Sequence, residues 1–252
     1  MKIYYEPSPD PRVSDFNNLI ADRFPEFLKE EKPEVILVAG GDGAMHHATK
    51  KFPHYEGIYL GKGLGTLNFL MNEIADDIGT LEKLQRDRLE LTIISTATIA
   101  VSINGSAVGY AANDIVFGDS INGYHTFALS TSDGSFDKFT LKGTGMCIAT
   151  PLGSTAYNFN NGGVILPLES NLWSMTGIVC NKYINDIITA QETKIWVSDG
   201  TLFLDGIETK QLASTDEVLL GIGNPVKIGF LDPHRFMKRR IEMANRMRKG
   251  TI

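Results

Sequence analysis

Cysteine and tryptophan are scarce in this chain of 252 residues, which has two of each. Cys147 and Cys180 are too few for a disulfide-rich extracellular domain and lack the spacing of a metal site, so we expect both thiols to be reduced. No run of about 18 apolar residues is present, and the first residues lack the apolar segment of a secretory signal. We therefore expect a soluble, cytoplasmic protein that does not span a membrane.

Positive charge is also in deficit. The chain has 24 Lys and Arg against 30 Asp and Glu, a net charge of −6, whereas general nucleic-acid binders usually carry a basic surface. Otherwise the composition is that of a globular protein, with 42% hydrophobic residues, and the length suits one or two domains. We expect no nucleic-acid partner, while a small anionic ligand would require only local positive charge.

The hydrophobic pattern changes near residue 90. Before it, apolar strand patterns alternate with helical ones, which predicts an α/β layer; the segments are strands at 2–5, 35–38 and 57–60 and helices at 13–29, 44–52 and 67–86. After it, short β-branched segments separated by turn residues predict a mainly β region up to about residue 231. The β segments are 92–103, 109–112, 114–117, 126–130, 194–197, 201–204, 217–223 and 226–231.

The pattern thus predicts two domains. Residues 1–90 should form a Rossmann-like, three-layer α/β domain, against which a basic helix within residues 235–252 packs. Residues 91–234 should form a β-rich domain. Neither an internal repeat nor a long flexible linker interrupts this division.

The first candidate site follows the apolar run at residues 35–38. Gly40, Gly41 and Gly43 allow a ligand to approach the backbone, and the amides at the start of the next helix point toward an anion. Asp42 is unusual there, because a carboxylate repels phosphate. It suggests a magnesium ligand, a base for a sugar hydroxyl, or both; the alternative is a simple turn in which Asp42 caps the helix.

Two further polar elements lie in the β-rich region. Residues 150–157 (TPLGSTAY) offer backbone amides, hydroxyls and the flat ring of Tyr157, and Gly162-Gly163 permits close approach. Asn113 and Asp114 place an amide beside a carboxylate at the start of a strand, an arrangement suited to a ribose diol or a carboxamide. Each element alone is more often a turn.

Together these motifs resemble the NAD kinase family. Residues 40–43 (GGDG), 65–70 (GTLNFL), 113–114 (ND) and 150–157 with Gly162-Gly163 occur in the family's order and at similar spacing. GGDG is shared with lipid kinases of the diacylglycerol kinase class, whereas TPLGSTAY followed by two glycines is far more specific. The resemblance implies an NAD kinase-like two-domain fold that binds the dinucleotide at the domain junction, in a homodimer or homotetramer.

The resemblance also implies roles for individual residues. Asp42 would be the general base acting on the adenosine-ribose 2′-hydroxyl, with Gly43 beside the bound NAD. Asn113 and Asp114 would hold ribose and adenine-side groups. The other residues expected to bind NAD are Lys142, Thr144, Thr155, Ala156, Tyr157, Asn158, Phe159 and Asn160, and those expected in the phosphate loops are Gly40, Gly41, Gly65 and Thr66.

The implied reaction is phosphoryl transfer from ATP, or from polyphosphate as in some relatives, to NAD, which gives NADP. Mg²⁺ is the expected divalent metal ion, and no residue is assigned as its ligand. Three positions depart from the family: Thr144 replaces an Asp that contacts the nicotinamide end, Asn68 replaces a glycine, and Ile207 replaces a polar residue.

Two alternatives remain open. A lipid or sphingoid-base kinase would share GGDG and a GTxN-like turn. A dinucleotide-binding protein without catalysis would fit the altered residues Thr144 and Asn68. The chain has neither GxxxxGK[ST] nor a complete GxGxxG, which counts against a P-loop enzyme and an ordinary Rossmann dehydrogenase.

Overall fold

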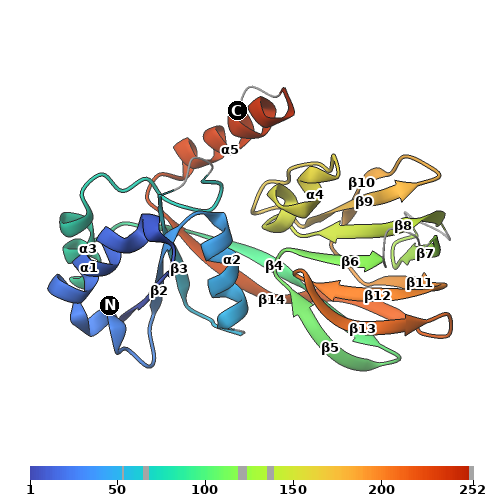
Figure 1. Ribbon diagram of the computed structural model, residues 1–252, viewed down its shortest axis with the longest axis horizontal. Helices are drawn as coiled ribbons and strands as arrows, with labels where there is room; N and C mark the ends of the chain where they lie inside the picture. Colours follow the sequence, from blue (N-terminus) through green and yellow to red (C-terminus); the bar gives the residue numbers. More distant parts are fainter. Residues whose placement is uncertain (53, 65–67, 119–123, 135–138, 250–252) are drawn as a thin grey trace. The chain divides into compact units, whose positions relative to one another are not determined.

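The computed structural model describes residues 1–52, 54–64, 68–118, 124–134 and 139–249 (Figure 1). The chain forms two compact units, Met1–Ser95 with Val226–Ile252 and Thr96–Pro225. These boundaries differ from the expected ones at residues 90 and 234. The reason is that the chain passes between the units within two long strands, β4 (Thr92–Ile103) and β14 (Val218–Phe230), and not within turn-rich loops.

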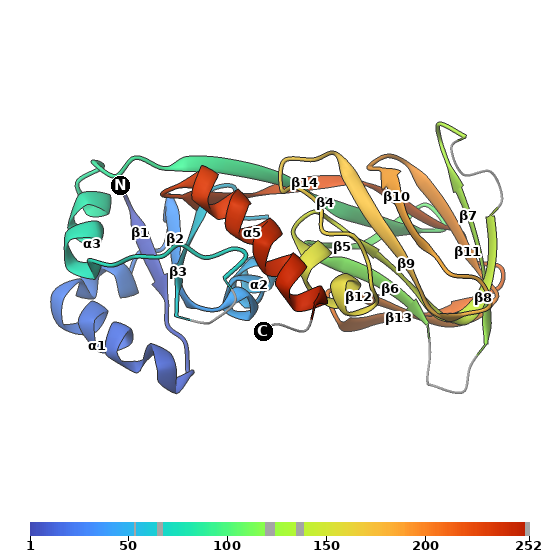
Figure 2. The same cartoon turned by 90° about the horizontal axis from the view of Figure 1, so that it is seen from above.

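The first unit is an α/β layer. Its strands are all parallel, in the order β1 (Ile3–Glu6), β2 (Val35–Gly40), β3 (Ile58–Gly63) and the end of β14. Its helices are α1 (Ser14–Arg23), α2 (Asp42–Lys51), α3 (Asp77–Gln85) and α5 (Pro233–Arg248). Figures 1 and 2 show α1 and α3 on one face of the sheet and α2 on the other. Every residue of β2 is buried, as a strand covered on both faces requires.

Two helix predictions in this unit were wrong in extent. The helix expected at 13–29 is α1 flanked by 3-10 turns at Pro11–Val13 and Pro25–Leu28, because Pro25 cannot continue the α-helix. Of the helix expected at 67–86, only α3 is helical among the described residues. The preceding residues are not helical because their backbone groups bond elsewhere: the Asn72 N–H donates to Gly61 O, and Asn72 O accepts from Gly63 N, both at 2.8 Å.

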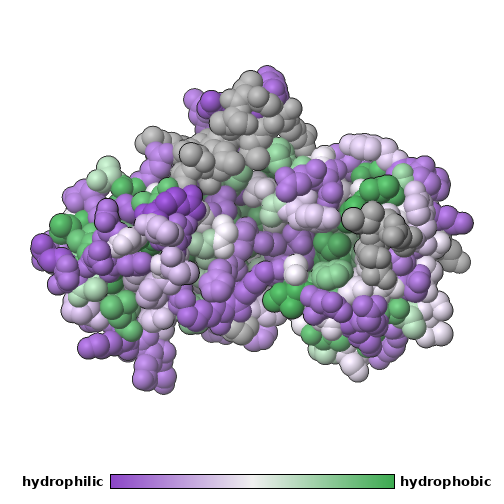
Figure 3. Space-filling view, viewed as in Figure 1, coloured by the Kyte–Doolittle hydropathy of each residue, from purple (hydrophilic) through white to green (hydrophobic). Residues whose placement is uncertain are grey.

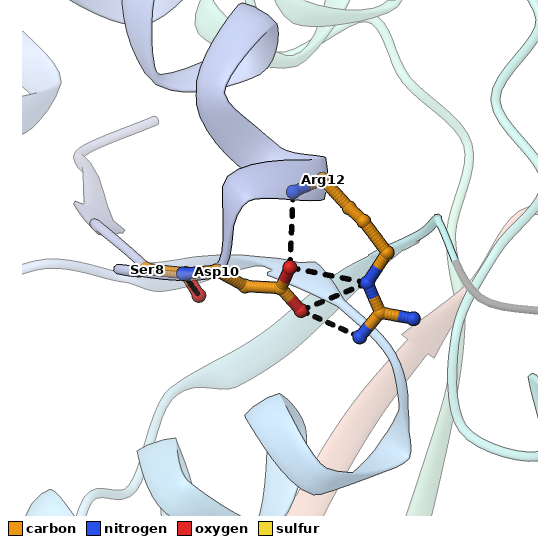
Figure 4. Close-up of polar contacts among 3 residues, drawn as sticks. All are labelled: Ser8, Asp10 and Arg12. Atoms are coloured by element: carbon orange, nitrogen blue, oxygen red, sulfur yellow. Dashed lines mark hydrogen bonds and ion pairs between the residues drawn. The ribbon is translucent and has the colours of Figure 1, made fainter.

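A polar turn links β1 to α1 (Figure 4). The Asp10 carboxylate accepts the Arg12 backbone N–H at 2.9 Å and contacts the Arg12 guanidinium at 2.5–3.1 Å. The side-chain hydrogen bonds from Arg12 hold the pKa of Asp10 below its ordinary value. The pair fixes where the turn begins. Because it is exposed to solvent, it adds little to stability.

The second unit is a β structure whose strands pair in the antiparallel sense. Residues 218–220 of β14 pair with β11, and the order continues through β7, β8, β6, β12 and β13; β9 and β10 extend it from β8, and β4 pairs with β14 and β5. The strands are β5 (Ser106–Ala111), β6 (Asp114–Gly118), β7 (His125–Thr131), β8 (Phe139–Ala149), β9 (Leu172–Cys180), β10 (Asn185–Thr189), β11 (Thr193–Val197), β12 (Asp199–Leu204) and β13 (Ile207–Ala213). A hydrophobic core of this unit contains Phe117, Phe127 and Trp173.

Strands β8 and β9 were not predicted from the sequence, because their glycines resemble turn signals. In the sheet these glycines allow close contact between neighbours. A Cβ at Gly143 would lie 2.2 Å from Cys180 Sγ, and one at Gly145 would lie 2.8 Å from Phe117 O. The fold class itself, an α/β unit with a β-rich unit, agrees with the prediction.

The outer surface matches the charged composition. The face seen in Figure 3 is mostly hydrophilic, with smaller apolar areas. Within the described ranges, none of the helices has both the length and the apolar character needed to cross a membrane. Cys147, which is buried, and Cys180, which is half-buried, are both free thiols.

Asn72 should be a major stabilising residue of the α/β unit. Its buried side chain donates to Gly61 O at 3.1 Å and to Gly229 O at 2.9 Å, and it accepts from Leu231 N at 2.8 Å. Asn72→Ala removes these three side-chain hydrogen bonds from a buried site and should lower the free energy of unfolding by about 2–4 kcal/mol. Urea unfolding measures this loss. Asn18→Ala, on the exposed side of α1, is the control and should change it by less than about 0.5 kcal/mol.

Candidate functional site

Gly40, the last residue of β2, has a backbone conformation that favours glycine. Gly40 has a φ of +141°, and a Cβ there would lie 2.9 Å from Ala44 Cβ. A Cβ at Gly41 or Gly43 would meet no other atom within 4 Å. The backbone at these two positions is therefore open to a ligand at the carboxyl end of a parallel strand, where α/β sheets bind their ligands.

Asp42 does not cap the helix that it begins. The N-cap of α2 is Gly41, and no side chain bonds to it there, so the capping alternative is wrong. The Asp42 carboxylate instead accepts two backbone N–H groups from a distant segment, Phe69 N at 2.9 Å on Oδ2 and Leu70 N at 2.8 Å on Oδ1. One hydrogen bond on each oxygen fixes the orientation of the carboxylate, and further lone pairs remain for a substrate.

The surroundings of Asp42 tune its protonation. Burial raises the pKa of its carboxyl to about 6, opposed by the amides of Phe69 and Leu70 and by the charge of Arg240. Burial lowers the pKa of His46, one turn further along α2, to about 4, so this imidazole is neutral at pH 7. Asp42 is therefore ionised at neutral pH, with a pKa close enough to accept a proton from a hydroxyl.

A pocket of about 330 Å³ lies in the β-rich unit. Its volume is at the small end of ligand sites, which span about 300–1,000 Å³. It brings together four predicted residues, Asn113, Asp114, Ala156 and Tyr157. The residues that complete the lining are Val116, Phe203, Asp205 and Gly206. Aromatic surfaces beside an amide and carboxylates suit a ring that carries hydroxyl groups.

Asp205 holds the Asn113-Asp114 pair in place. Its Oδ1 accepts Asn113 N–H at 2.7 Å and Asp114 N–H at 3.1 Å, and its Oδ2 accepts Ala112 N–H at 2.9 Å. In return the Asp205 N–H donates to Asp114 O at 2.9 Å. Asp205 adopts a φ of +50° in the β12–β13 turn, a conformation that Asp tolerates better than most residues. A single carboxylate thus sets the backbone at the start of β6.

In residues 150–160 some side chains are buried within the loop and others face outward. Ser154 and Asn158 are fully buried. Asn158 donates to Ser154 O at 3.3 Å and to Val164 O at 3.1 Å, and it accepts from Ser174 Oγ at 3.1 Å. Asn158 therefore shapes the loop, and it is not among the residues that line the pocket. The outward residues include Tyr157, which is 43% exposed.

The other predicted residues lie outside the pocket lining. Thr155 and Phe159 are partly exposed and Asn160 is exposed, all within or next to the short helix α4 (Tyr157–Asn160). On β8, Lys142 is exposed, and the Thr144 hydroxyl donates to Ile178 O at 2.9 Å. Gly65 and Thr66 fall outside the described residues.

The sequence did not predict the groups that orient Asp42 and the Asn113-Asp114 pair. The Asp205-Gly206 dipeptide is a turn signal, but its contact with residues 112–114 depends on the pairing of β12 with β6. The amides of Phe69 and Leu70 are backbone groups, so they leave no residue-type signal. Arg240 lies within the predicted basic helix, and its helical spacing from the apolar positions 237, 243 and 244 was a signal that could have separated it from its exposed neighbours.

The comparisons with known proteins agree with these motifs. No protein-family model matches the chain. An NAD kinase from Rickettsia akari is 34% identical over 162 residues, which are 60% of this chain and 59% of that relative. Over this region the chain is similar to NAD kinases. An NAD kinase from Rickettsia bellii is 31% identical over 157 residues, 59% of this chain and 57% of the relative. The matches thus span somewhat over half the length of these NAD kinases.

Two solved structures share the fold of the chain. Yeast NADH kinase complexed with NADH has a TM-score of 0.75 at 19% identity and covers 95% of this chain and 86% of its own. An NAD kinase from Archaeoglobus fulgidus in complex with ATP has a TM-score of 0.70 at 16% identity and covers 96% and 97%. At these identities the likeness establishes the NAD kinase fold and confirms the predicted architecture.

The effect of the three hydrogen bonds that Asp205 accepts should be measurable without any ligand. Asp205→Asn replaces an acceptor oxygen with an amide group that faces backbone N–H donors, and should cost about 1–3 kcal/mol of stability. The amides of residues 112–114 should exchange with deuterium at least about tenfold faster, as read by mass spectrometry. Asp216→Asn is the control, since Asp216 also accepts a backbone N–H, that of Ala213, in another turn. Unchanged exchange at 112–114 would show that Asp205 does not hold this segment.

Proposed function

We propose that this protein is an NAD kinase, which transfers the γ-phosphoryl group of ATP to the 2′-hydroxyl of the adenosine ribose of NAD. The products are NADP and ADP. The observation that carries the proposal is the Asp42 carboxylate, which follows an open glycine turn and is oriented by the amides of Phe69 and Leu70. The homology to NAD kinases supports the same activity.

Asp42 serves as the general base in this proposal. Each carboxylate oxygen accepts one amide hydrogen bond and retains a lone pair for the ribose hydroxyl. As the hydroxyl proton moves to Asp42, the ribose oxygen bonds to the γ-phosphorus and the bond to the bridging oxygen breaks, so ADP leaves with the electron pair. Asp42 then releases its proton to water. Such transfer depends mainly on positioning and on charge stabilisation.

The pocket of the β-rich unit would bind the adenosine portion of NAD. Tyr157 and Phe203 offer aromatic surface for the base, and Asn113 and Asp114 offer polar groups for the ribose hydroxyls. A pocket of about 330 Å³ suits one nucleoside-sized group better than a long lipid chain. This is the feature that favours a dinucleotide over a lipid as the substrate.

Magnesium would enter with the phosphate donor. Within the part of the chain that the structure describes, no three His, Cys, Asp or Glu residues are grouped to hold a metal ion. Mg²⁺ commonly binds through phosphates and water with few protein ligands, so this arrangement fits an ion carried by ATP. When bound, it would neutralise charge on the phosphates.

The direct test uses purified protein, Mg²⁺, NAD and either ATP or polyphosphate, with NADP measured by an NADP-specific dehydrogenase. We expect NADP to form with ATP. NAD binding without NADP formation with either donor would indicate a non-catalytic dinucleotide-binding protein. Transfer of labelled phosphate to a sphingoid base or to diacylglycerol, and not to NAD, would indicate a lipid kinase.

Removal of the proposed base should separate catalysis from binding. Asp42→Asn should lower kcat by about 10²–10⁴, the usual contribution of general base catalysis, while the Kd for NAD stays within about tenfold, or 1.4 kcal/mol. Steady-state kinetics and calorimetry give the two quantities. Asp22→Asn, at an exposed position on α1, is the matched control. Turnover close to that of the unmodified protein would exclude Asp42 as the base.

The pH dependence of the rate should report the same carboxyl group. Asp42 has a pKa raised to about 6, so it is protonated and inactive as a base below that pH and ionised above it. We expect kcat/KM for NAD, which reports groups of the free enzyme, to rise with pH and to reach half its plateau near pH 6. A rate that stays constant from pH 5 to pH 8 would contradict an ionised Asp42 as the base.

A further inference from the structure

We propose that Arg240, on the C-terminal helix α5, is a positioning residue that fixes Asp42 through the backbone of residues 69–70. The inference rests on the proposed function in one respect, namely that Asp42 is the base. It assigns to the end of the chain a role in arranging a site formed near its beginning.

The burial of Arg240 is unusual for α5. Its side chain is 2% exposed, whereas Ile241, the next residue, is 58% exposed. Helical spacing puts position 240 in line with the apolar positions 237, 243 and 244, so this helix carries a charged residue in the middle of its apolar face. Because a charge is costly to bury without partners, the guanidinium must interact favourably with groups inside the unit.

Phe69 supplies two of these groups. Arg240 Nη1 lies 3.4 Å from Phe69 O, and the Arg240 Cζ lies 5.9 Å from the centre of the Phe69 ring. The second contact is within the usual range for a cation–π interaction. The arginine therefore contacts both the backbone and the side chain of the residue whose N–H binds Asp42.

One peptide group connects Arg240 to Asp42. Phe69 C=O and Leu70 N–H belong to the same planar peptide unit. The carbonyl accepts from Arg240 Nη1, and the N–H donates to Asp42 Oδ1 at 2.8 Å. A peptide held at both edges cannot rotate without breaking one of the two bonds, so Arg240 restricts the donor that orients the carboxylate.

The charges near Asp42 define the electrostatic part of this role. Burial raises the pKa of Asp42, and the amides of Phe69 and Leu70 and the charge of Arg240 from α5 each lower it. His46 from α2 is neutral at pH 7, because burial, Lys50 and Arg240 all lower its pKa. Of these groups, Arg240 supplies the positive charge that opposes the effect of burial on Asp42.

Two substitutions separate the charge from the hydrogen bond. Arg240→Gln keeps an N–H donor but loses the charge, and Arg240→Lys keeps the charge but loses the planar fork. The Asp42 carboxyl is titrated by ¹³C NMR in aspartate-labelled protein, with its signal identified by its loss in Asp42→Asn. Kinetics with NAD give kcat and KM for the same variants.

We expect Arg240→Gln to raise the titration midpoint of Asp42 by about one pH unit and to lower kcat at pH 6 at least about fivefold, with little change in KM for NAD. Arg240→Lys should keep the midpoint within about 0.3 pH unit while kcat falls. Lys238→Gln, on the same helix with a 78% exposed side chain, is the control and should change neither quantity.

An unshifted midpoint in Arg240→Gln, or an equal rise in both Arg240 variants, would overturn the proposal. Arg240→Gln that shows no cooperative unfolding transition is not folded, and Arg240→Lys then tests the proposal. In Arg240→Lys, a retained titration midpoint of Asp42 with a reduced kcat supports the positioning role. A raised midpoint or an unchanged kcat refutes it. The NMR titration needs no turnover. If the unmodified protein forms no NADP, the proposed function fails, while the midpoints still report whether Arg240 controls Asp42.

Discussion

The structure of the α/β unit depends on how one carboxylate is satisfied. Asp42 begins α2 directly after a glycine turn, and it binds the amides of Phe69 and Leu70 in place of capping its own helix. Those two donors are available only because the residues before α3 are not helical. The same segment is tied to β3 and β14 through Asn72. The helical propensity of this segment is therefore overridden by its long-range hydrogen bonds to Asp42. A buried carboxylate without hydrogen-bond donors would cost more free energy than a few helical residues contribute.

The β-rich unit uses the same interaction for a different purpose. Asp205 accepts three backbone N–H groups, whereas Asp42 accepts two. Asp205 thereby shapes the backbone of the pocket, while Asp42 keeps lone pairs for a ligand. Hydrogen bonds from backbone amides to a carboxylate are stronger than hydrogen bonds between neutral groups, and they set orientation as well as distance. One acidic residue is thus structural and the other is suited to chemistry, although both follow or precede a glycine in a turn.

The architecture and the motifs of the candidate site could be predicted from the sequence better than the contacts that hold these motifs in place. Periodicity separated the α/β unit from the β-rich unit, and the motifs named Asn113 and Tyr157, which both line the pocket. The glycines of β8 and β9 were misleading, because in this sheet they mark close packing and not turns. Asn158 directly follows the most specific motif and was expected to bind NAD, yet its side chain is buried within the loop. Whether a motif residue faces the ligand or the core depends on the fold around it, which one sequence does not reveal.

Arg240 shows why such support can come from the far end of a chain. Strand β14 leaves the β-rich unit, pairs in parallel with β3, and is followed by α5, which begins at Pro233. This path returns the last helix to the unit that contains Asp42, after an insertion of well over 100 residues. The entropy of closing a loop grows only with the logarithm of its length, by about 0.6 kcal/mol for each doubling, so a large inserted unit adds little cost. The sheet register, and not closeness in sequence, therefore decides which residues can support the carboxylate, and a reading of neighbouring residues alone cannot find them.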